Sequence, residues 1–294
     1  MNNKNYTIIN LPPFLLNIFD VSSMNFITKL FFIIYGKLVQ FVYFFTERSL
    51  FCKLINILLP RHAAIYFDGK HYYKKITENI TIFYPNKRIS RVISQQQEIF
   101  KKIFSSYCLE KIAFTEGDVV IDCGANVGEL NVAFNLMEIN VNYIGIEPDK
   151  ETFECLEKNK IKDTDYFINV ALSDESTEKK LFLDRVGGNS SIIYFGKDKF
   201  EIVKTSRLDD LDIPNKIKLL KLEAEGYEPE ILLGAKKMIQ HIEYVSVDFG
   251  SERGESAENT VVEVNKFLIE NNFKLISFSD YRLIGLYQNN NELG

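Results

Sequence analysis

The chain of 294 residues is long enough for one large domain with an extension. Hydrophobic residues make up 46% and charged residues 26%, as in an ordinary globular core, and a net charge of −5 without an arginine-rich stretch argues against nonspecific nucleic-acid binding. The four cysteines are widely spaced and form no C-x-x-C pair, which argues against a zinc site or a disulfide framework and favours the reducing conditions of the cytoplasm.

Residues 1–60 are expected to form an N-terminal extension, in which residues 24–45 are strongly apolar. Lys29, Lys37 and Gln40 interrupt this segment and share one side of a helix, so we expect an amphipathic helix with a wide apolar face. Three interpretations are open: the face packs against the rest of the protein or a second subunit, it lies in a membrane surface, or the helix spans a membrane. The second would place a cytoplasmic protein at the inner face of the membrane.

Residues 61–112 are expected to lead into the main domain. Apolar and polar residues alternate on both sides of a turn at residues 68–69, which predicts a β-hairpin within residues 61–92. Residues 95–112 have the pattern of a helix.

Residues 113–290 alternate between short apolar runs and helical patterns. Strands are expected at 119–123, 143–147, 166–172, 217–222, 243–248, 274–278 and 282–287, with helices at 127–137, 150–159, from about 229, and 258–271. This order predicts an α/β fold with a doubly wound, mostly parallel seven-stranded sheet, helices on both faces and an antiparallel C-terminal hairpin. Residues 174–212 break the rhythm and predict an irregular β insertion with short strands at 179–183, 191–194 and 201–205.

The first strand of this domain runs into a glycine-spaced turn. Asp122 ends the strand, and Gly124 and Gly128 form a G-x-x-x-G spacing in which the backbone can come close to a ligand. A dinucleotide site would have G-x-G-x-x-G, and an acid at this place would repel a pyrophosphate. The acid suits the ammonium of an amino-acid moiety, so the turn favours S-adenosylmethionine.

Two later strand ends fit a nucleoside at the same edge of the sheet. Glu147 ends the second strand, 23 residues after Gly124, where an acid can accept both ribose hydroxyls. Nicotinamide cofactors use the same device, so Glu147 discriminates only together with Asp122 and the glycine spacing; alone, it could be a solvated strand-end acid. The end of the third strand, residues 169–174, is expected beside the adenine.

The end of the fourth strand is rich in acids. Period-two alternation puts Glu223 and Glu225 on one side of the strand end, facing the crevice. An exposed acidic loop would give the same sequence pattern. Glu228 and Glu230 flank Pro229 and match the first turn of a helix.

Five blocks, at residues 118–129, 144–149, 169–174, 206–211 and 220–235, resemble FkbM-type S-adenosylmethionine-dependent methyltransferases in order and spacing. The resemblance covers residues 95–285, and the family usually has Asp where this chain has Glu223. It implies the Rossmann-like class I methyltransferase fold and S-adenosylmethionine as cofactor. The cofactor-binding positions that it implies, together with the motifs above, are Asp122, Gly124, Ala125, Asn126, Gly128, Glu129, Glu147, Pro148, Asp149, Asn169, Val170 and Ala171.

The resemblance implies O-methylation of a hydroxyl on a sugar, a glycan, a lipid-linked saccharide or a secondary metabolite. Such a transfer needs a positioned acceptor oxygen and a group that removes its proton. With only three histidines in the chain, we expect a carboxylate base: Glu225 or Glu223, with Asp248 as an alternative. Lys221 could stabilise developing charge or be a strand-edge lysine in solvent. The three acids could instead hold Mg²⁺.

Two other functions fit the same sheet. A methyltransferase-like domain that has lost its activity would serve as a binding scaffold, and a nicotinamide-dependent oxidoreductase would use the same strand ends. Arg253, in the loop after the fifth strand, could bind an anionic group of the acceptor.

Overall fold

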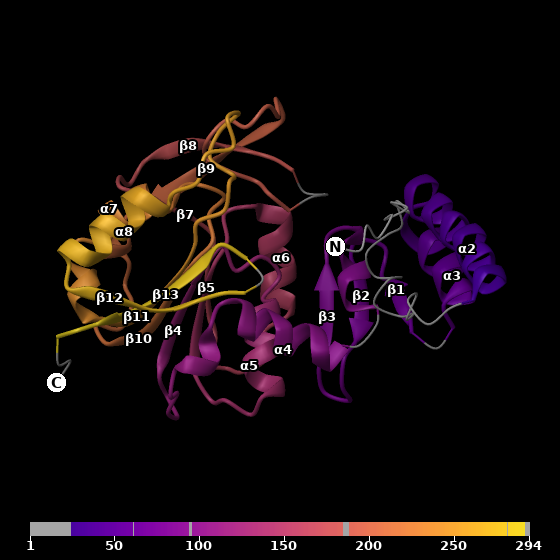
Figure 1. Cartoon of the computed structure of the whole chain (residues 1–294), viewed down its shortest axis with the longest axis horizontal. Helices are drawn as coiled ribbons and strands as arrows, with labels where there is room; N and C mark the ends of the chain where they lie inside the picture. Colours follow the sequence, from indigo (N-terminus) through magenta and orange to yellow (C-terminus); the bar gives the residue numbers. More distant parts are fainter. Residues whose placement is uncertain (1–24, 61, 94–95, 185–187, 281, 292–294) are drawn as a thin grey trace, which may run out of the picture. The chain divides into compact units, whose positions relative to one another are not determined.

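The computed structural model describes residues 25–60, 62–93, 96–184, 188–280 and 282–291 (Figure 1). Residues 1–24 of the predicted extension, Met24 included, lie outside the described residues. The chain divides into two compact units, the first ending at Ile99 and the second beginning at Phe100. The extension and the strands that follow it, predicted as separate segments, therefore belong to one unit.

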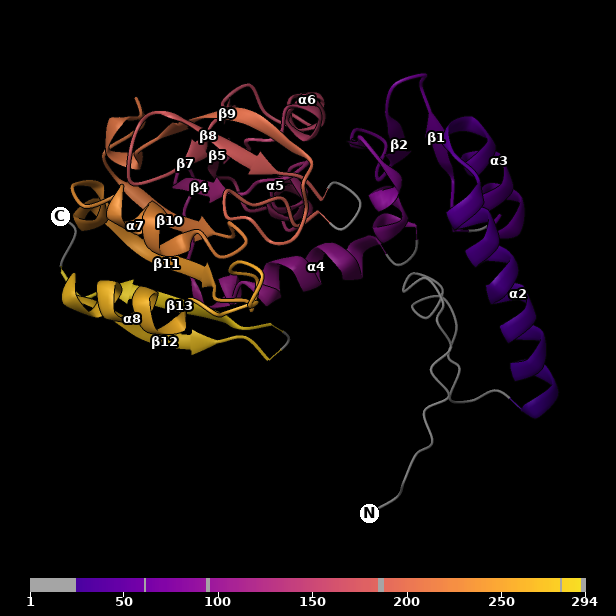
Figure 2. The same cartoon turned by 90° about the horizontal axis from the view of Figure 1, so that it is seen from above.

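The first unit combines two helices with a small antiparallel sheet (Figure 2). Its helices are α2 (Phe26–Phe45) and α3 (Arg48–Leu58), and its strands, in the order β1-β2-β3, are β1 (Ile65–Phe67), β2 (Tyr72–Lys75) and β3 (Thr81–Tyr84). A 3₁₀ helix, η2 (Lys87–Val92), follows. The predicted hairpin is thus correct for β1 and β2 and has a third strand beside it.

The predicted helix over residues 24–45 is confirmed as α2. Most of its wide apolar face is exposed within the first unit. The Asn25 side chain caps it by accepting a hydrogen bond from the Thr28 amide at 2.9 Å. Phe32, Gly36, Val39 and Val42 are its buried residues, whereas most of its large apolar side chains are exposed. Within the described part of the first unit this face is therefore not packed, and the three interpretations of what covers it stay predictions.

The second unit is built on a seven-stranded sheet in the order β12-β13-β11-β10-β4-β5-β6. Strand β13 runs antiparallel to both β11 and β12, and the pairs among β11, β10, β4, β5 and β6 are all parallel, as predicted. The strands are β4 (Val119–Cys123), β5 (Asn142–Ile146), β6 (Tyr166–Ile168), β10 (Ile217–Leu222), β11 (Ile242–Asp248), β12 (Phe273–Phe278) and β13 (Ile284–Asn289).

Helices cover both sides of this sheet, which confirms the doubly wound arrangement. In Figure 1, α7 and α8 lie on one side of the central strands and the end of α4 lies with α5 on the other. The helices are α4 (Gln96–Ser106), α5 (Glu129–Leu136), α6 (Lys150–Lys158), α7 (Glu228–Leu233) and α8 (Val261–Glu270), with 3₁₀ turns η3 (Leu109–Lys111), η4 (Leu208–Asp210) and η5 (Met238–His241). The helix expected at 95–112 breaks at Cys108, whose φ is 58°.

The predicted third strand is two strands in two sheets. After Ile168 the chain leaves the large sheet, and β7 (Ala171–Leu172) pairs with β9 (Phe200–Ser206), which also pairs with β8 (Glu178–Phe182). This three-stranded sheet is the predicted β insertion. The strand expected at 191–194 is wrong: Ser191 forms only an isolated bridge with Phe182, and its hydroxyl donates to the Glu225 carbonyl.

The topology places a ligand site at the carboxyl ends of β4 and β10. Strand β4 lies between β5 and β10, so the chain proceeds outward from β4 in one direction and then returns to the other side. Ligands of open α/β sheets bind at such a switch point. Along β10, Leu220 and Leu222 belong to the hydrophobic core, whereas Lys221 between them points to the opposite face, beside Asp122 of β4.

Candidate functional site

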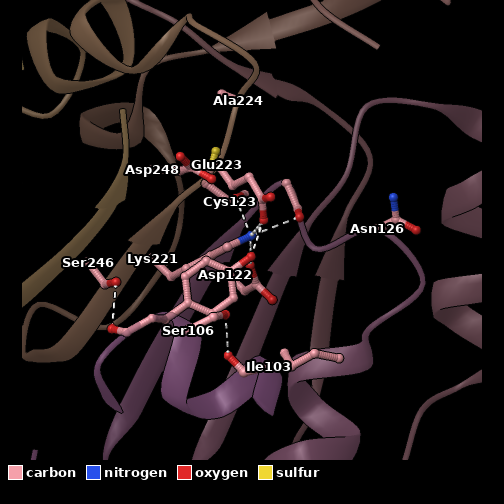
Figure 3. Close-up of polar contacts among 12 residues, drawn as sticks. Ile103, Ser106, Asp122, Cys123, Asn126, Lys221, Glu223, Ala224, Ser246 and Asp248 are labelled. Carbon is pink, nitrogen blue, oxygen red and sulfur yellow. Dashed lines mark hydrogen bonds and ion pairs between the residues drawn. The ribbon is translucent and has the colours of Figure 1, made fainter. Parts of the chain in front are cut away.

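A buried lysine occupies the centre of the switch point (Figure 3). Lys221 Nζ lies 2.8 Å from Asp122 Oδ1 and 3.3 Å from Glu223 Oε2. It also donates to the backbone carbonyls of Cys123 at 3.1 Å and Gly124 at 3.0 Å. The side chain is only 3% exposed, so Lys221 is not the solvated strand-edge lysine that the sequence left open.

The acids around Lys221 keep it charged. Burial by itself would lower the pKa of Lys221, but the charges of Asp122 and Glu223 raise it well above its ordinary value. Asp122 is buried as well, and its second oxygen accepts a hydrogen bond from Tyr143. Its Oδ1 forms the ion pair with Lys221. Asp122 is therefore committed to Lys221, and the ammonium role predicted for it would require this pair to open.

Glu223 is held by three partners, two of them from distant parts of the chain. Tyr107 and Arg282 both donate hydrogen bonds to its carboxylate, and Lys221 lies beside it. Burial would raise the pKa of Glu223, but Lys221 and Arg282 outweigh it and lower the pKa. A carboxylate stabilised in this way is a weak base, which disfavours the predicted role of Glu223 as proton acceptor.

Asp248, at the end of β11, shares Arg282 with Glu223. It accepts hydrogen bonds from Arg282 and from the Gly250 amide, the latter at 2.9 Å. Burial raises the pKa of Asp248 to about 6, against the opposing effect of Arg282. Because a guanidinium bridges Glu223 and Asp248, the proposed Mg²⁺ site would have to displace it. Across the described residues, no group of three His, Cys, Asp or Glu side chains is arranged to hold a metal ion.

Two residues of this network were missed in the sequence. Tyr107 follows α4, and the Ser246 hydroxyl of β11 donates to its carbonyl at 2.9 Å. Arg282 was predicted as the first residue of the last strand, but β13 begins at Ile284 and Arg282 lies in the loop before it. The signal that was available is charge balance, since several acids predicted at one sheet edge require cations nearby.

Glu225 has a different environment from the other acids. Its φ is 52°, a left-handed conformation that is uncommon for a residue other than glycine. Burial and the neighbouring Glu252 carboxyl raise the pKa of Glu225. Its Oε2 is buried and has no hydrogen-bond partner among the residues described. Of the three predicted base candidates, Glu225 is the one with an uncommitted oxygen.

Glu228 holds the loop that carries Glu225. Its Oε1 accepts hydrogen bonds from the amides of Ala224 at 2.9 Å and Gly226 at 3.2 Å, and its Oε2 accepts one from Thr260 at 3.2 Å. Burial raises the pKa of Glu228 to about 7. Its position in the first turn of α7 was predicted correctly, but its side chain accepts hydrogen bonds from the loop before α7.

Arg253 is occupied by protein groups. It forms a bidentate pair with Glu230, at 2.7 and 3.0 Å, and donates to the Gly226 carbonyl. The prediction that Arg253 binds an anionic group of the acceptor therefore lacks support. Glu230, predicted in the first turn of α7, is the ion-pair partner of Arg253.

The glycines of the predicted cofactor turn make room for protein atoms. Gly124 and Gly128 have φ values of 73° and 84°. A Cβ on Gly124 would lie 2.0 Å from the Glu223 carbonyl oxygen, and one on Gly128 would lie 2.9 Å from a methyl group of Leu156. Gly124 thus lets the loop after β10 approach β4. The approach of a ligand to this backbone stays a prediction.

Glu147 links the two loops at the ends of β4 and β5. Its carboxylate accepts hydrogen bonds from the Asn126 amide at 3.0 Å and the Asp149 amide at 2.9 Å. Burial raises the pKa of Glu147 to about 7. A carboxylate has about four acceptor positions and these amides use two of them, so Glu147 fits a ribose that offers two hydroxyls. Glu147 and the adjoining turn are the residues that would hold S-adenosylmethionine.

Asn169 holds the loop after β5 at the same edge of the sheet. Its side-chain amide donates to the carbonyls of Glu147 at 2.8 Å and Pro148 at 3.1 Å. Asp149 caps α6 by accepting a hydrogen bond from the Thr152 amide at 2.9 Å. The other predicted cofactor positions lie in or next to these loops, namely Ala125, Glu129, Val170 and Ala171. The cofactor role stays a prediction for all of the positions.

Comparison with known proteins agrees with this geometry. A family model described as the methyltransferase FkbM domain matches residues 122–275, which is more than half of the chain. The chain belongs to the FkbM methyltransferase family. Its members depend on S-adenosylmethionine, so this chain is an S-adenosylmethionine-dependent methyltransferase, and the nicotinamide-dependent alternative has no support.

Solved structures with low identity resemble the chain in part. A SAM-dependent methyltransferase from Aquifex aeolicus is 13% identical, with a TM-score of 0.39, and the match covers 65% of this chain and 97% of that one. M. capricolum TrmK in complex with S-adenosylhomocysteine is 10% identical, with a TM-score of 0.38 and coverage of 67% and 69%. P. horikoshii TYW2 in complex with MeSAdo is 9% identical, with a TM-score of 0.43 and coverage of 82% and 81%. A search of curated proteins found no match.

Proposed function

We propose that this FkbM methyltransferase methylates a hydroxyl oxygen of a saccharide: a sugar, a glycan or a lipid-linked saccharide. Bound S-adenosylmethionine supplies an activated methyl group. The protein must then position the acceptor and remove its proton. A net charge of −5 disfavours a nucleic acid as the acceptor. The apolar helix α2 is what favours the lipid-linked form.

The observation that carries the proposal is the environment of Glu225. It combines a buried, unpartnered oxygen with a neighbouring carboxyl, that of Glu252. Burial and Glu252 raise the pKa of Glu225 to about 10, so near neutral pH the two carboxyls share one proton, and the carboxylate that is left ionised within the pair can accept another. Glu223 and Asp248 are both tied to Arg282. His241, the histidine of the second unit, precedes β11 at the opposite edge of the sheet. Glu225 with Glu252 is therefore the proton acceptor that we propose.

Cofactor binding is tested first, by calorimetric titration with S-adenosylhomocysteine. We expect Glu147→Ala to weaken binding at least about tenfold, because a buried carboxylate that accepts ribose hydroxyls is lost. The matched control is Glu157→Ala, which removes an exposed acid of the adjacent helix α6. Equal affinity in the two variants would contradict the assignment of Glu147.

Methyl transfer is tested with S-adenosylmethionine labelled with tritium in the methyl group. The acceptors are monosaccharides, nucleoside diphosphate sugars, lipid-linked saccharides and total RNA. We expect label in a saccharide fraction, in a product that resists mild base, as an ether does and a methyl ester does not. Label in RNA alone would overturn the proposal, and S-adenosylhomocysteine binding without turnover on every acceptor would favour the binding scaffold.

The role of Glu225 has its own test on the active acceptor. We expect Glu225→Gln to lower kcat by about 10²- to 10⁴-fold, the usual contribution of a general base, while S-adenosylhomocysteine affinity stays within about twofold. Glu255→Gln, in the exposed part of the same loop as Glu252, should leave kcat unchanged. A Glu225→Gln enzyme with the wild-type kcat would show that the proton leaves by another route.

A further inference from the structure

Helix α2 carries an apolar stripe that nothing in the described structure covers. The stripe consists of Ile27, Phe31, Ile34, Leu38, Phe41 and Phe45, which follow one another at intervals of three or four residues. Each of these side chains is between 48% and 74% exposed. At 1.5 Å per residue the stripe is about 27 Å long. An uninterrupted exposed apolar surface of this kind marks an interaction site.

The opposite face of α2 is attached to its own unit. Val39 and Val42 are buried there, and α2 packs against α3. Tyr35 donates a hydrogen bond to the Leu58 carbonyl at the end of α3, and Lys87 donates to the Tyr43 carbonyl at 2.5 Å. The two faces therefore differ: one is fixed to a folded unit with polar contacts, and the other is free.

This attachment decides between lying on a membrane and crossing it. Helix α2 is long and apolar enough to cross, and it is one candidate span by length and composition. If α2 crossed the membrane, the end of α3 and the hydrogen bond from Lys87 to α2 would be drawn into the hydrocarbon. The neighbouring open sheet β1-β2-β3 would be drawn in with them. Sheet edges and unpaired polar groups are not tolerated there. A helix lying in the membrane surface leaves the polar unit in water and buries the stripe.

The charge balance of α2 and α3 fits an anionic surface. The two helices and their caps carry four basic residues, Lys29, Lys37, Arg48 and Lys53, against one acid, Glu47. Glu47 is ion-paired with Lys87 at 2.8 Å. The chain as a whole has a net charge of −5, so this basic character is local. On α3, exposed Leu50 and Ile57 lie on the same side as Lys53, which repeats the combination of apolar and basic side chains.

We propose that α2 lies flat in the surface of an anionic lipid bilayer, with the stripe buried in the lipid and the first unit outside it. The contact is peripheral. It concerns where the enzyme is held and does not depend on the acceptor or on methyl transfer, so either proposal can fail alone.

The absence of tryptophan in the chain gives a direct test. Ile27→Trp and Leu38→Trp each place one tryptophan on the stripe, about 16 Å apart along the helix. Val262→Trp places one at an exposed apolar position of α8, which is 72% exposed. With vesicles of phosphatidylcholine and phosphatidylglycerol, we expect a blue shift and quenching by brominated lipid for the first two and neither effect for the third.

Quenching depth separates the two membrane arrangements. A flat helix puts Ile27→Trp and Leu38→Trp at the same depth, whereas a spanning helix puts the second much deeper. Unequal depths would overturn the proposal in favour of a span. A wild-type protein that does not sediment with these vesicles would also overturn it, because lipid would then not be the partner of the stripe.

Substitutions in the full chain test which residues make the contact. We expect Ile34→Glu with Leu38→Glu to lower vesicle partitioning at least tenfold, and Val262→Glu to change it less than twofold. Lys37→Gln and Lys53→Gln should each weaken binding about fivefold on anionic vesicles, and not on phosphatidylcholine alone. If the stripe variants instead halve the molar mass in light scattering and leave partitioning unchanged, the partner is a second copy of the chain and the proposal is wrong.

Discussion

Replacing Lys221 with methionine tests how the candidate site is held together. The substitution keeps the side chain up to the position of Cε but removes the cation that faces Asp122 at 2.8 Å and Glu223 at 3.3 Å. It also removes the donor to the carbonyls of Cys123 and Gly124. Removing one partner of a buried ion pair costs about 3–5 kcal/mol, because the other charge is left uncompensated.

The expected change in thermal stability follows from the size of the second unit. For units of 150–250 residues, each kcal/mol shifts Tm by about 2–4 °C, so Lys221→Met should lower Tm by roughly 6–20 °C. Urea unfolding followed by circular dichroism gives the free energy directly. The double variant Lys221→Met with Asp122→Asn should recover at least about 1 kcal/mol, because the buried negative charge is removed with its partner.

Lys218 provides a matched control on the same strand. It pairs with Glu243 at 2.8 Å, at a more exposed position of β10. Lys218→Met should therefore cost clearly less than Lys221→Met, about 1 kcal/mol, because water reaches this half-buried pair. If Lys221→Met were as mild as Lys218→Met, the reasoning that places a buried charge network at the centre of the site would be refuted.

Two further substitutions test other parts of the second unit. Gly124→Ala should destabilise the protein by about 1–3 kcal/mol more than Gly117→Ala. Both glycines have a positive φ, but only at Gly124 would a Cβ lie 2.0 Å from the Glu223 carbonyl oxygen. Equal losses of stability in urea unfolding would contradict the close approach of the two loops. Burial raises the pKa of Glu228 from 4.5 to about 7, so its folded state binds a proton more tightly and its contribution to stability falls as pH rises from about 4.5 to 7. Glu228→Gln, which does not titrate, should lose less stability than the wild type over that interval, and an unchanged pH profile would show that Glu228 does not titrate there.

Much of the fold could be read from the sequence because its periodicities are strong. The apolar run that ends at Asp122 was predicted as a strand with the bounds that β4 has. The strand and helix alternation gave the seven-stranded sheet and its antiparallel C-terminal hairpin, since connections in such sheets are short and of fixed hand. The third strand was assigned wrongly because an apolar run does not show where the chain leaves one sheet for another. Asn169, which braces the preceding loop, stands at that break.

The candidate site divides in the same way. The sequence by itself determined that carboxylates gather at the ends of β4, β5 and β10, because parallel strands bring their carboxyl ends to one edge of a sheet. Which of these acids is held by other side chains depended on Tyr107 and Arg282, which donate hydrogen bonds to Glu223 from 116 and 59 residues away in the chain. Likewise, the sequence determined that α2 has a wide apolar face, and only tertiary packing decided that the described part of the first unit leaves this face exposed. The periodicity of a short segment specifies on which side of its helix or strand a residue lies. The residues that contact it come from distant segments of the chain, and no local periodicity shows which segments these are.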